Sequence, residues 1–116
     1  NSSRILSHEE FSDLGPVHIS TEDGSEGYRG FVTGIPAFRD ESWDRVYCCG
    51  PEPMMKAVAA ECSRRGIFCE VSLENLMACG MGICLCCIVP TKSGNLCSCT
   101  DGPVFNINDL KWQISV

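Results

Sequence analysis

Four cysteines fall within nine positions of this sequence, residues 79 to 87, and glycines lie between the first two. Three of these cysteines have the spacing C-x4-C-x2-C, and a fourth follows after eleven further residues, which gives the set Cys79, Cys84, Cys87 and Cys99. This is the plant-type spacing of [2Fe–2S] ligands. One loop would wrap a flat inorganic core, while the distant cysteine closes its other side. The spacing therefore predicts these four residues as metal ligands.

The glycines in this loop suit the same chemistry. Gly80 and Gly82 allow the backbone to approach a cluster closely and to point amides at its sulfurs without a clash from Cβ atoms. Two neighbouring cysteines do not fit the spacing. We expect Cys86 to face away from the cluster, on an extended segment 85–89, and Cys97 to share a strand face with Cys99. Neither Cys86 nor Cys97 is predicted to be a ligand.

Other uses of the cysteines stay open at this point. A tetrahedral zinc ion could take Cys84 and Cys87 together with Cys97 and Cys99, although structural zinc sites usually pair two short C-x2-4-C knuckles. Disulfides are disfavoured, because the chain has no export signal and thiols inside cells are kept reduced. A further group, Cys48, Cys62 and Cys69, occupies strand and helix positions, and we interpret these residues as buried packing.

Composition and charge exclude several classes of protein. The 116 residues carry a net charge of −6 with no run of Lys or Arg, which argues against nucleic acid or an anionic membrane as a partner. No stretch approaches the ~20 apolar residues that cross a bilayer, so we expect a cytoplasmic globular chain. The sequence begins at Asn1 without a methionine, and we expect a shortened form rather than a complete gene product.

The middle of the chain predicts a βαβ unit. A strand at 45–49 runs into Gly50 and Pro51, which suit the start of a helix, and that helix has an apolar i, i+4 stripe. A further strand at 67–73 would pair in parallel with the first. Upstream, we expect a short helix that Gly15 ends, a strand at 17–20, and a glycine-rich acidic loop at 21–34.

A change of composition at residues 72–74 predicts a domain boundary, with one domain at 1–73 and another at 74–116. The second domain is rich in cysteine and glycine, with short antiparallel strands predicted at 85–89 and 95–98. It carries too little apolar content for a core of its own, so a metal centre would supply the missing stability.

The motifs together resemble a known family. The segment 72–74 leading into the cysteine loop at 77–87, followed by Cys99-x-Asp101-Gly102-Pro103-Val104-Phe105, is similar to the C-terminal iron–sulfur domain of dihydroorotate dehydrogenase electron-transfer subunits. The upstream segments 23–25, 30–33 and 49–51 are similar to the NAD-binding domain of the same subunits, within the ferredoxin reductase superfamily. The resemblance implies an α/β fold: part of an NAD-binding domain with a parallel sheet, then a small [2Fe–2S] domain.

The resemblance also implies a function in pyrimidine biosynthesis. Electrons from dihydroorotate would reach FMN in a partner catalytic subunit, pass through the [2Fe–2S] cluster to FAD, and leave to NAD⁺. Carried over to this chain, Cys79 and Cys84 would hold one iron, and Cys87 and Cys99 the other. The NAD contacts would be Cys49, Gly50 and Pro51 near the nicotinamide, with Glu22 and Asp23 as acceptors for a ribose or as solvated loop charges.

The chain departs from the family by what it lacks. A complete subunit begins with a flavin-binding barrel and the first strands of the NAD domain, and none of these is present. We therefore expect the 116 residues alone to be inactive, and their exposed strand edges to favour a homodimer or a strand swap. The alternatives are a subunit of a related NAD(P)H–ferredoxin or sulfhydrogenase-type oxidoreductase, or a zinc-stabilised interaction module.

Overall fold

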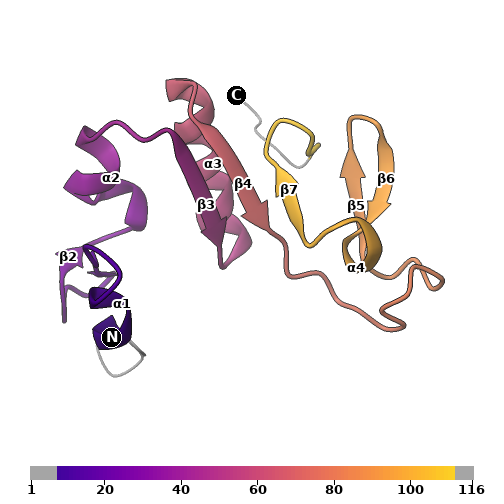
Figure 1. Ribbon diagram of the computed structural model, residues 1–116, viewed down its shortest axis with the longest axis horizontal. Helices are drawn as coiled ribbons and strands as arrows, with labels where there is room; N and C mark the ends of the chain where they lie inside the picture. Colours follow the sequence, from indigo (N-terminus) through magenta and orange to yellow (C-terminus); the bar gives the residue numbers. More distant parts are fainter. Residues whose placement is uncertain (1–7, 112–116) are drawn as a thin grey trace. The chain divides into compact units, whose positions relative to one another are not determined.

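The computed structural model describes residues 8–111, which divide into two compact units, one ending at Ser42 and the other beginning at Trp43. The first unit contains the helices α1 (His8–Ser12) and α2 (Pro36–Asp40), a 3₁₀ helix (Val32–Gly34), and two short parallel strands, β1 (Ser20–Thr21) and β2 (Tyr28–Arg29) (Figure 1). The strand predicted at 17–20 is therefore largely wrong, because only its last residue is paired. Neither β2 nor α2 was predicted.

The second unit opens with the predicted βαβ arrangement. Strand β3 (Arg45–Cys49) leads through Pro51 into helix α3 (Glu52–Arg65), and β4 (Phe68–Ser72) pairs with β3 in parallel. The apolar stripe of α3 packs on the sheet as expected, with its buried side chains being Met55, Val58, Ala59 and Cys62. Two of the three cysteines interpreted as packing, Cys62 and Cys69, are fully buried at this interface, and Cys48 is half-buried.

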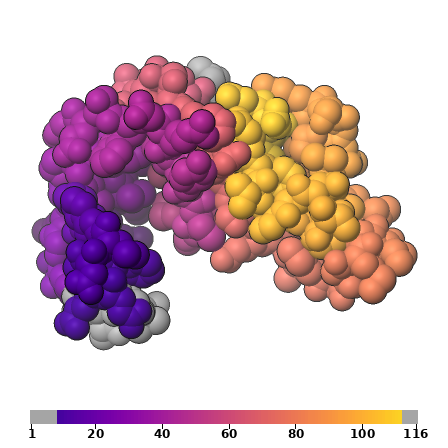
Figure 2. Space-filling model, in the orientation of Figure 1, coloured from indigo at the N-terminus to yellow at the C-terminus, as the bar shows by residue number. Residues whose placement is uncertain are grey.

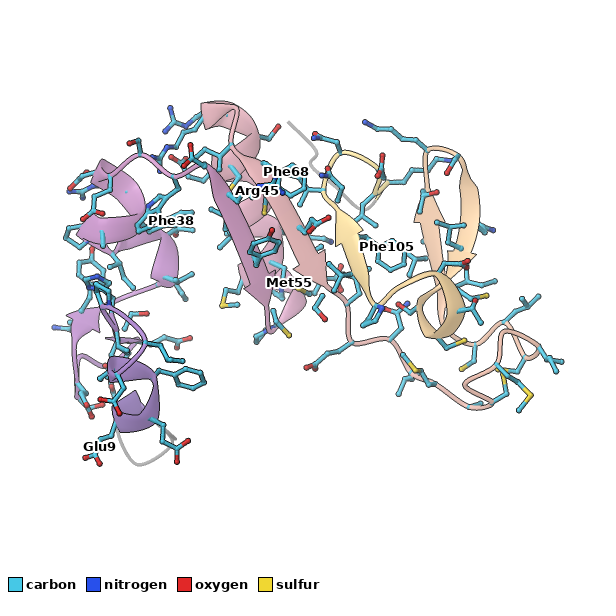
Figure 3. The ribbon with its side chains drawn as sticks, in the orientation of Figure 1. Glu9, Phe38, Arg45, Met55, Phe68 and Phe105 are labelled. Carbon is cyan, nitrogen blue, oxygen red and sulfur yellow. The ribbon has the colours of Figure 1, made fainter. Side chains whose placement is uncertain are left out.

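A third strand, which the sequence did not predict, completes this sheet. Strand β7 (Val104–Asn106) pairs antiparallel with β4, so the order is β3-β4-β7. Phe105 is buried from β7, and Figure 3 shows its side chain between β7 and the neighbouring hairpin. Because β7 has only three residues, its alternation is too short to distinguish from a loop. Its pairing ties the C-terminal segment directly to the βαβ sheet.

The predicted hairpin is present, with different bounds. Strands β5 (Ile88–Thr91) and β6 (Gly94–Cys97) pair antiparallel, with Ile88 opposite Cys97. The strand does not begin at Leu85, because that residue has a left-handed backbone with φ of 57°. The predicted extension to Ser98 is also wrong, because residues 98–101 form the short helix α4 (Ser98–Asp101).

The core of this C-terminal part is shared with the sheet. Val89 and Leu110 are 1% and 0% exposed, and Thr91 of β5 forms an isolated antiparallel bridge with Leu110. Ile107 is also buried, and its amide donates to the carbonyl of Cys69 in β4 at 3.1 Å. The apolar side chains here thus pack as part of one unit with β4. Among residues 8–111, no helix has the length and apolar character needed to cross a membrane.

The burial of Leu110 predicts its contribution to stability. Leu110→Ala should lower the free energy of unfolding by about 2–5 kcal/mol, since it removes a fully buried side chain and leaves a cavity. Leu76→Ala is the matched control, because Leu76 is 84% exposed, and it should change stability by less than about 0.5 kcal/mol. Urea unfolding measures both. Equal effects of the two substitutions would contradict the assigned core.

Burial raises the pKa of the Cys69 thiol from 9.0 to about 12. Above pH 9.0 the unfolded chain releases this proton while the folded chain keeps it, so the contribution to stability is constant below pH 9.0 and falls as the pH rises toward 12. Cys69→Ala should therefore show a shallower loss of stability between about pH 9 and about pH 11 than the wild type, in urea unfolding of the reduced, metal-free chain. Identical slopes would contradict the raised pKa.

Candidate metal centre

The predicted ligand loop lies between β4 and β5 and contains no helix or strand. Its backbone turns sharply at Gly80 and Gly82, whose φ angles of 68° and 78° are in the left-handed region that glycine adopts without strain. Leu85 adopts the same region with a side chain present, which carries a cost of about 1 kcal/mol or more. These three left-handed residues therefore set the path of the loop backbone.

Backbone amides in this loop point at cysteine sulfurs. The amides of Met81 and Cys84 both donate to Cys79 Sγ at 3.4 Å, and the amide of Cys86 donates to Cys84 Sγ at 3.4 Å. These bonds favour the thiolate, and the amide of Cys84, followed by that of Met81, lowers the pKa of Cys79 to about 6. A thiolate is the form that binds metal. Cys79 and Cys84 form a first pair, since their side chains are also hydrogen-bonded.

Cys87 and Cys99 form a second pair. Cys87 directly precedes β5 and is 3% exposed, while Cys99 lies in α4. The Ser98 amide donates to the Cys87 carbonyl at 3.0 Å, which brings α4 against the base of the loop. The amide of Cys99, followed by its thiol, lowers the pKa of Cys87. The Cys87 sulfur in turn raises the pKa of Cys99, so the proton of this pair stays on Cys99.

The two pairs are brought together where the loop meets α4. A Cβ atom at Gly82 would lie only 3.1 Å from Thr100 Cγ2, so the loop packs closely on the helix at a point where only glycine fits without a shift. The Gly82 amide also donates to the sulfur of Cys99. The structure thus gathers the four predicted ligands from a loop and a helix that the sequence separates.

These residues fit a sulfur-bound metal centre. Four thiols suit soft metals such as iron in clusters or zinc. Amides that donate to the ligand sulfurs orient the ligands of a metal site and tune the reduction potential of an iron–sulfur cluster. Among residues 8–111, no three His, Cys, Asp or Glu side chains are placed to hold one metal ion. The hydrogen-bonded sulfurs instead divide into two pairs, which suits one metal ion per pair.

The structure corrects the positions of the two other cysteines. Cys86 does not lie on an extended strand, because β5 begins only at Ile88, and it sits exposed in the turn before it. Its amide donates to Cys84 Sγ, and the exclusion of its thiol from the ligand set stays a prediction. Cys97 and Cys99 do not share a strand face, because β6 ends at Cys97 and Cys99 lies in α4. The Cys97 thiol instead lies beside Cys87, and burial, followed by this neighbour, raises its pKa.

Two polar side chains at the site were missed. The side-chain amide of Asn75 donates to the carbonyls of Cys87 and Ile88 at 3.4 and 3.2 Å, and so clasps the two ends of the ligand loop. The Asp101 carboxylate accepts from the Cys97 amide at 2.7 Å. No sequence signal marks Asn75. Asp101 stands within the cysteine motif at 99–105, but nothing in the spacing indicates its role.

The predicted NAD contacts fall in two places within the second unit. Gly50 and Pro51 line a cavity of about 330 Å³ together with the start of α3, residues 73–75 and residues 88–90. Cys49 does not line this cavity, and instead borders a smaller hollow of about 170 Å³ beside Tyr47 on the sheet. Only part of this predicted set therefore faces a space large enough for a ring.

The other two predicted contacts, Glu22 and Asp23, belong to the first unit, where they directly follow β1 and are exposed. The Asp23 carboxylate is engaged with Ser25, whose amide donates to Oδ1 at 3.0 Å. Hydrogen bonds from Ser25 lower the pKa of Asp23 to about 2. The Asp23 side chain therefore stabilises the turn in which it lies.

The chain is similar to known iron–sulfur proteins. Residues 74–111 match the family model of the iron–sulfur cluster binding domain of dihydroorotate dehydrogenase B. The chain is 51% identical over 90 residues to the dihydroorotate dehydrogenase B (NAD(+)) electron transfer subunit of Clostridium perfringens, which covers 78% of the chain and 36% of that protein. The corresponding subunit of Shouchella clausii is 40% identical over 110 residues, 91% of the chain and 42% of that protein.

A solved structure is similar over nearly the whole chain. It is an NADH-dependent reduced ferredoxin-NADP oxidoreductase, with a TM-score of 0.84 and 29% identity, and the match covers 97% of this chain and 41% of that one. The chain spans about two fifths of the length of the curated relatives described above. It is therefore related to part of the electron transfer subunit of dihydroorotate dehydrogenase B, and its residues 74–111 match the iron–sulfur cluster binding domain of that enzyme.

Proposed function

We propose that this chain carries the [2Fe–2S] centre of an electron transfer subunit, with Cys79, Cys84, Cys87 and Cys99 as ligands. The observation that carries the proposal is the set of backbone amides that donate to the sulfurs of the loop. Such donors stabilise thiolates and disperse the negative charge of a cluster. The match of residues 74–111 to an iron–sulfur family supports the same conclusion.

The pairing of the sulfurs supports an assignment of the ligands. Cys79 and Cys84 would hold one iron, and Cys87 and Cys99 the other, because each pair is already in side-chain contact. When bound, such a cluster supplies one-electron transfer, here between an FMN-containing dihydroorotate dehydrogenase catalytic subunit and an FAD whose electrons leave to NAD⁺. The chain's own residues hold the sulfurs in place, with Cys84 exposed and Cys87 buried at the base of the loop.

The cavity beside α3 is our proposed position for the nicotinamide. Gly50 and Pro51 form its wall with little side-chain bulk at the carboxyl end of β3, where open α/β sheets bind ligands. Cys49 would contribute from the adjoining end of the strand. Glu22 and Asp23, in the first unit, stay a separate prediction as ribose acceptors, and the Asp23 carboxylate is already bonded to Ser25.

The ligand loop is the proposed contact for the catalytic subunit. Five large apolar side chains of the loop are more than half exposed: Leu76, Met77, Met81, Ile83 and Leu85. Figure 2 shows the loop, in salmon, as a protruding lobe of the second unit. A dense apolar group on a protruding loop is typical of a protein-binding surface. Burying it against the partner would also shield the cluster from water.

The 116 residues span about two fifths of the relatives, and we propose that by themselves they do not oxidise NADH. An FAD is needed to convert electron pairs into single electrons. Within the described sheet, β3 pairs with β4 on one side, and among residues 8–111 its other edge has no strand partner. A second copy or a swapped strand at that edge remains a prediction.

Two other functions remain candidates. The likeness to a ferredoxin-NADP oxidoreductase over 97% of the chain favours a related NAD(P)H–ferredoxin or sulfhydrogenase-type subunit as the alternative. A zinc-stabilised interaction module would need the same cysteines around one ion. Metal analysis separates this module from the redox proteins, because it would contain zinc without sulfide.

Serine substitutions test the ligand set. Each of Cys79, Cys84, Cys87 and Cys99, replaced by serine, should lose most of the visible absorption and of the roughly two irons and two sulfides per chain, because one iron loses a soft ligand. Cys86→Ser and Cys97→Ser are the matched controls and should keep both. The measurement is iron and sulfide analysis of anaerobically purified chains. A control that loses its cluster as fully as Cys84→Ser would overturn the assignment.

A charge on the apolar loop tests the partner surface. Ile83→Glu should weaken binding of the catalytic subunit by about tenfold or more, because a carboxylate would be buried in an apolar contact. Its iron content should not change, since Ile83 is 75% exposed. Leu14→Glu, at an 83% exposed residue of the first unit, is the control. Titration calorimetry against the catalytic subunit measures both, and equal weakening would argue against this loop as the interface.

A further inference from the structure

The segment that carries the ligands has few charged side chains. Between Asn75 and Pro103 the sequence has two charged side chains, Lys92 and Asp101. Lys92 lies in the turn of the β5–β6 hairpin, beyond the pair Thr91 and Gly94, whereas the ligands lie at the opposite end, beside the pair Ile88 and Cys97. Asp101 is thus the one formal charge that the segment places beside the four ligand cysteines.

Asp101 also closes the turn that presents Cys99. Its Oδ2 atom accepts from the Cys97 amide at 2.7 Å and from Thr100 Oγ1 at 3.3 Å. Cys97 is the N-cap of α4 and provides no side-chain cap of its own. The carboxylate at the end of the helix therefore reaches back to its beginning, as the returning acid does in a capping box. Cys99 lies between the two tied ends.

The backbone directly after Asp101 is packed against Phe105 and Ser98. A Cβ atom at Gly102 would collide with the ring of Phe105 and would lie 3.2 Å from the Ser98 carbonyl oxygen. Phe105 is itself buried, and its side chain lies beside β7 (Figure 3). The residue after Asp101 is thus packed against the core, and the carboxylate is held at a constant position relative to α4.

We propose that Asp101 is a positioning residue for Cys99 and that its negative charge sets the reduction potential of the centre. This inference rests on the proposed function, since it requires a cluster at the four cysteines. Reduction adds a negative charge to the cluster, and a fixed carboxylate nearby makes that addition less favourable. Asp101 is exposed, so solvent screens this effect to a modest size.

Substitutions separate the positioning role of Asp101 from the effect of its charge on the reduction potential. Asp101→Asn keeps an oxygen acceptor for the Cys97 amide and removes the charge, whereas Asp101→Ala removes both. Asp109→Asn is the matched control, because Asp109 is exposed and its carbonyl pairs with the Lys92 amide, at the far end of the hairpin. Iron and sulfide analysis comes first for every chain. Anaerobic redox titration of the visible absorption then gives the midpoint potential, and the rate of bleaching by a chelator gives cluster retention.

In Asp101→Asn, the ratio of reduced to oxidised centre at a fixed solution potential should rise about threefold. This corresponds to a midpoint potential about 30 mV higher, at 59 mV per tenfold change for one electron. Its bleaching rate should stay within about twofold of the wild type, whereas Asp101→Ala should show the same rise in potential and bleach several-fold faster. Asp109→Asn should change neither. A purely structural role would move the bleaching rate without moving the potential of Asp101→Asn.

Two results would overturn the inference. One is a midpoint potential of Asp101→Asn equal to that of the wild type or shifted no more than that of Asp109→Asn. The other is an Asp101→Asn chain that folds and binds no iron, because its amide oxygen should suffice to hold the turn. A wild-type chain without iron and sulfide would instead refute the proposed function itself, so the two failures are distinguishable.

Discussion

The pairing of β4 with β7 is the constraint on which the metal centre depends. All four candidate ligands lie in the segment between these strands, and the strands bring its two ends together. Ser72 is opposite Val104 in the sheet, and the Leu73 amide donates to the Pro103 carbonyl at 2.9 Å. The segment 73–103 thus begins and ends at the same place in the sheet. Sheet hydrogen bonds and the burial of Phe105 offset the entropy cost of closing this segment.

Inside that closed segment, hydrogen bonds to backbone groups arrange the sulfurs. Asn75 clasps the base of the loop, and the Cys87 carbonyl accepts both from Asn75 and from the Ser98 amide. The left-handed residues Gly80 and Gly82 then turn amides toward Cys79 and Cys99. The large apolar side chains of the same loop are exposed. This exposure is the basis of the proposed contact with a partner subunit.

The sequence predicts well those features that have a long period or a fixed spacing. The βαβ unit is predictable because the stripe of α3, between two strands, extends over several turns, and the helix begins after Gly50 and Pro51. The cysteine spacing selects four residues whose sulfurs form two hydrogen-bonded pairs in the structure, and their role as ligands stays a prediction. The comparisons confirm the family resemblance from which that role was inferred. The domain boundary at residue 73 and the individual NAD contacts remain predictions.

The missed features depend on contacts distant in the sequence or on single dihedral angles. Strand β7 is too short to show a period, and it is a strand only because β4 lies beside it. The sequence favours an extended Leu85, since leucine rarely adopts a left-handed backbone, and this wrong prediction also misplaces Cys86. Helix α4 has no start signal in the sequence, because its cap comes from Asp101 at its end instead of from the residue at its start.

If the four cysteines hold a [2Fe–2S] centre, as we propose, the chain takes up a single electron. Electron paramagnetic resonance of the anaerobically purified chain, titrated with dithionite, detects this electron. We predict an oxidised chain without signal, and uptake of about one electron per chain that gives roughly one unpaired spin from two coupled irons. A chain that takes up no electron and gives no signal while holding one tightly bound zinc would contradict the claim.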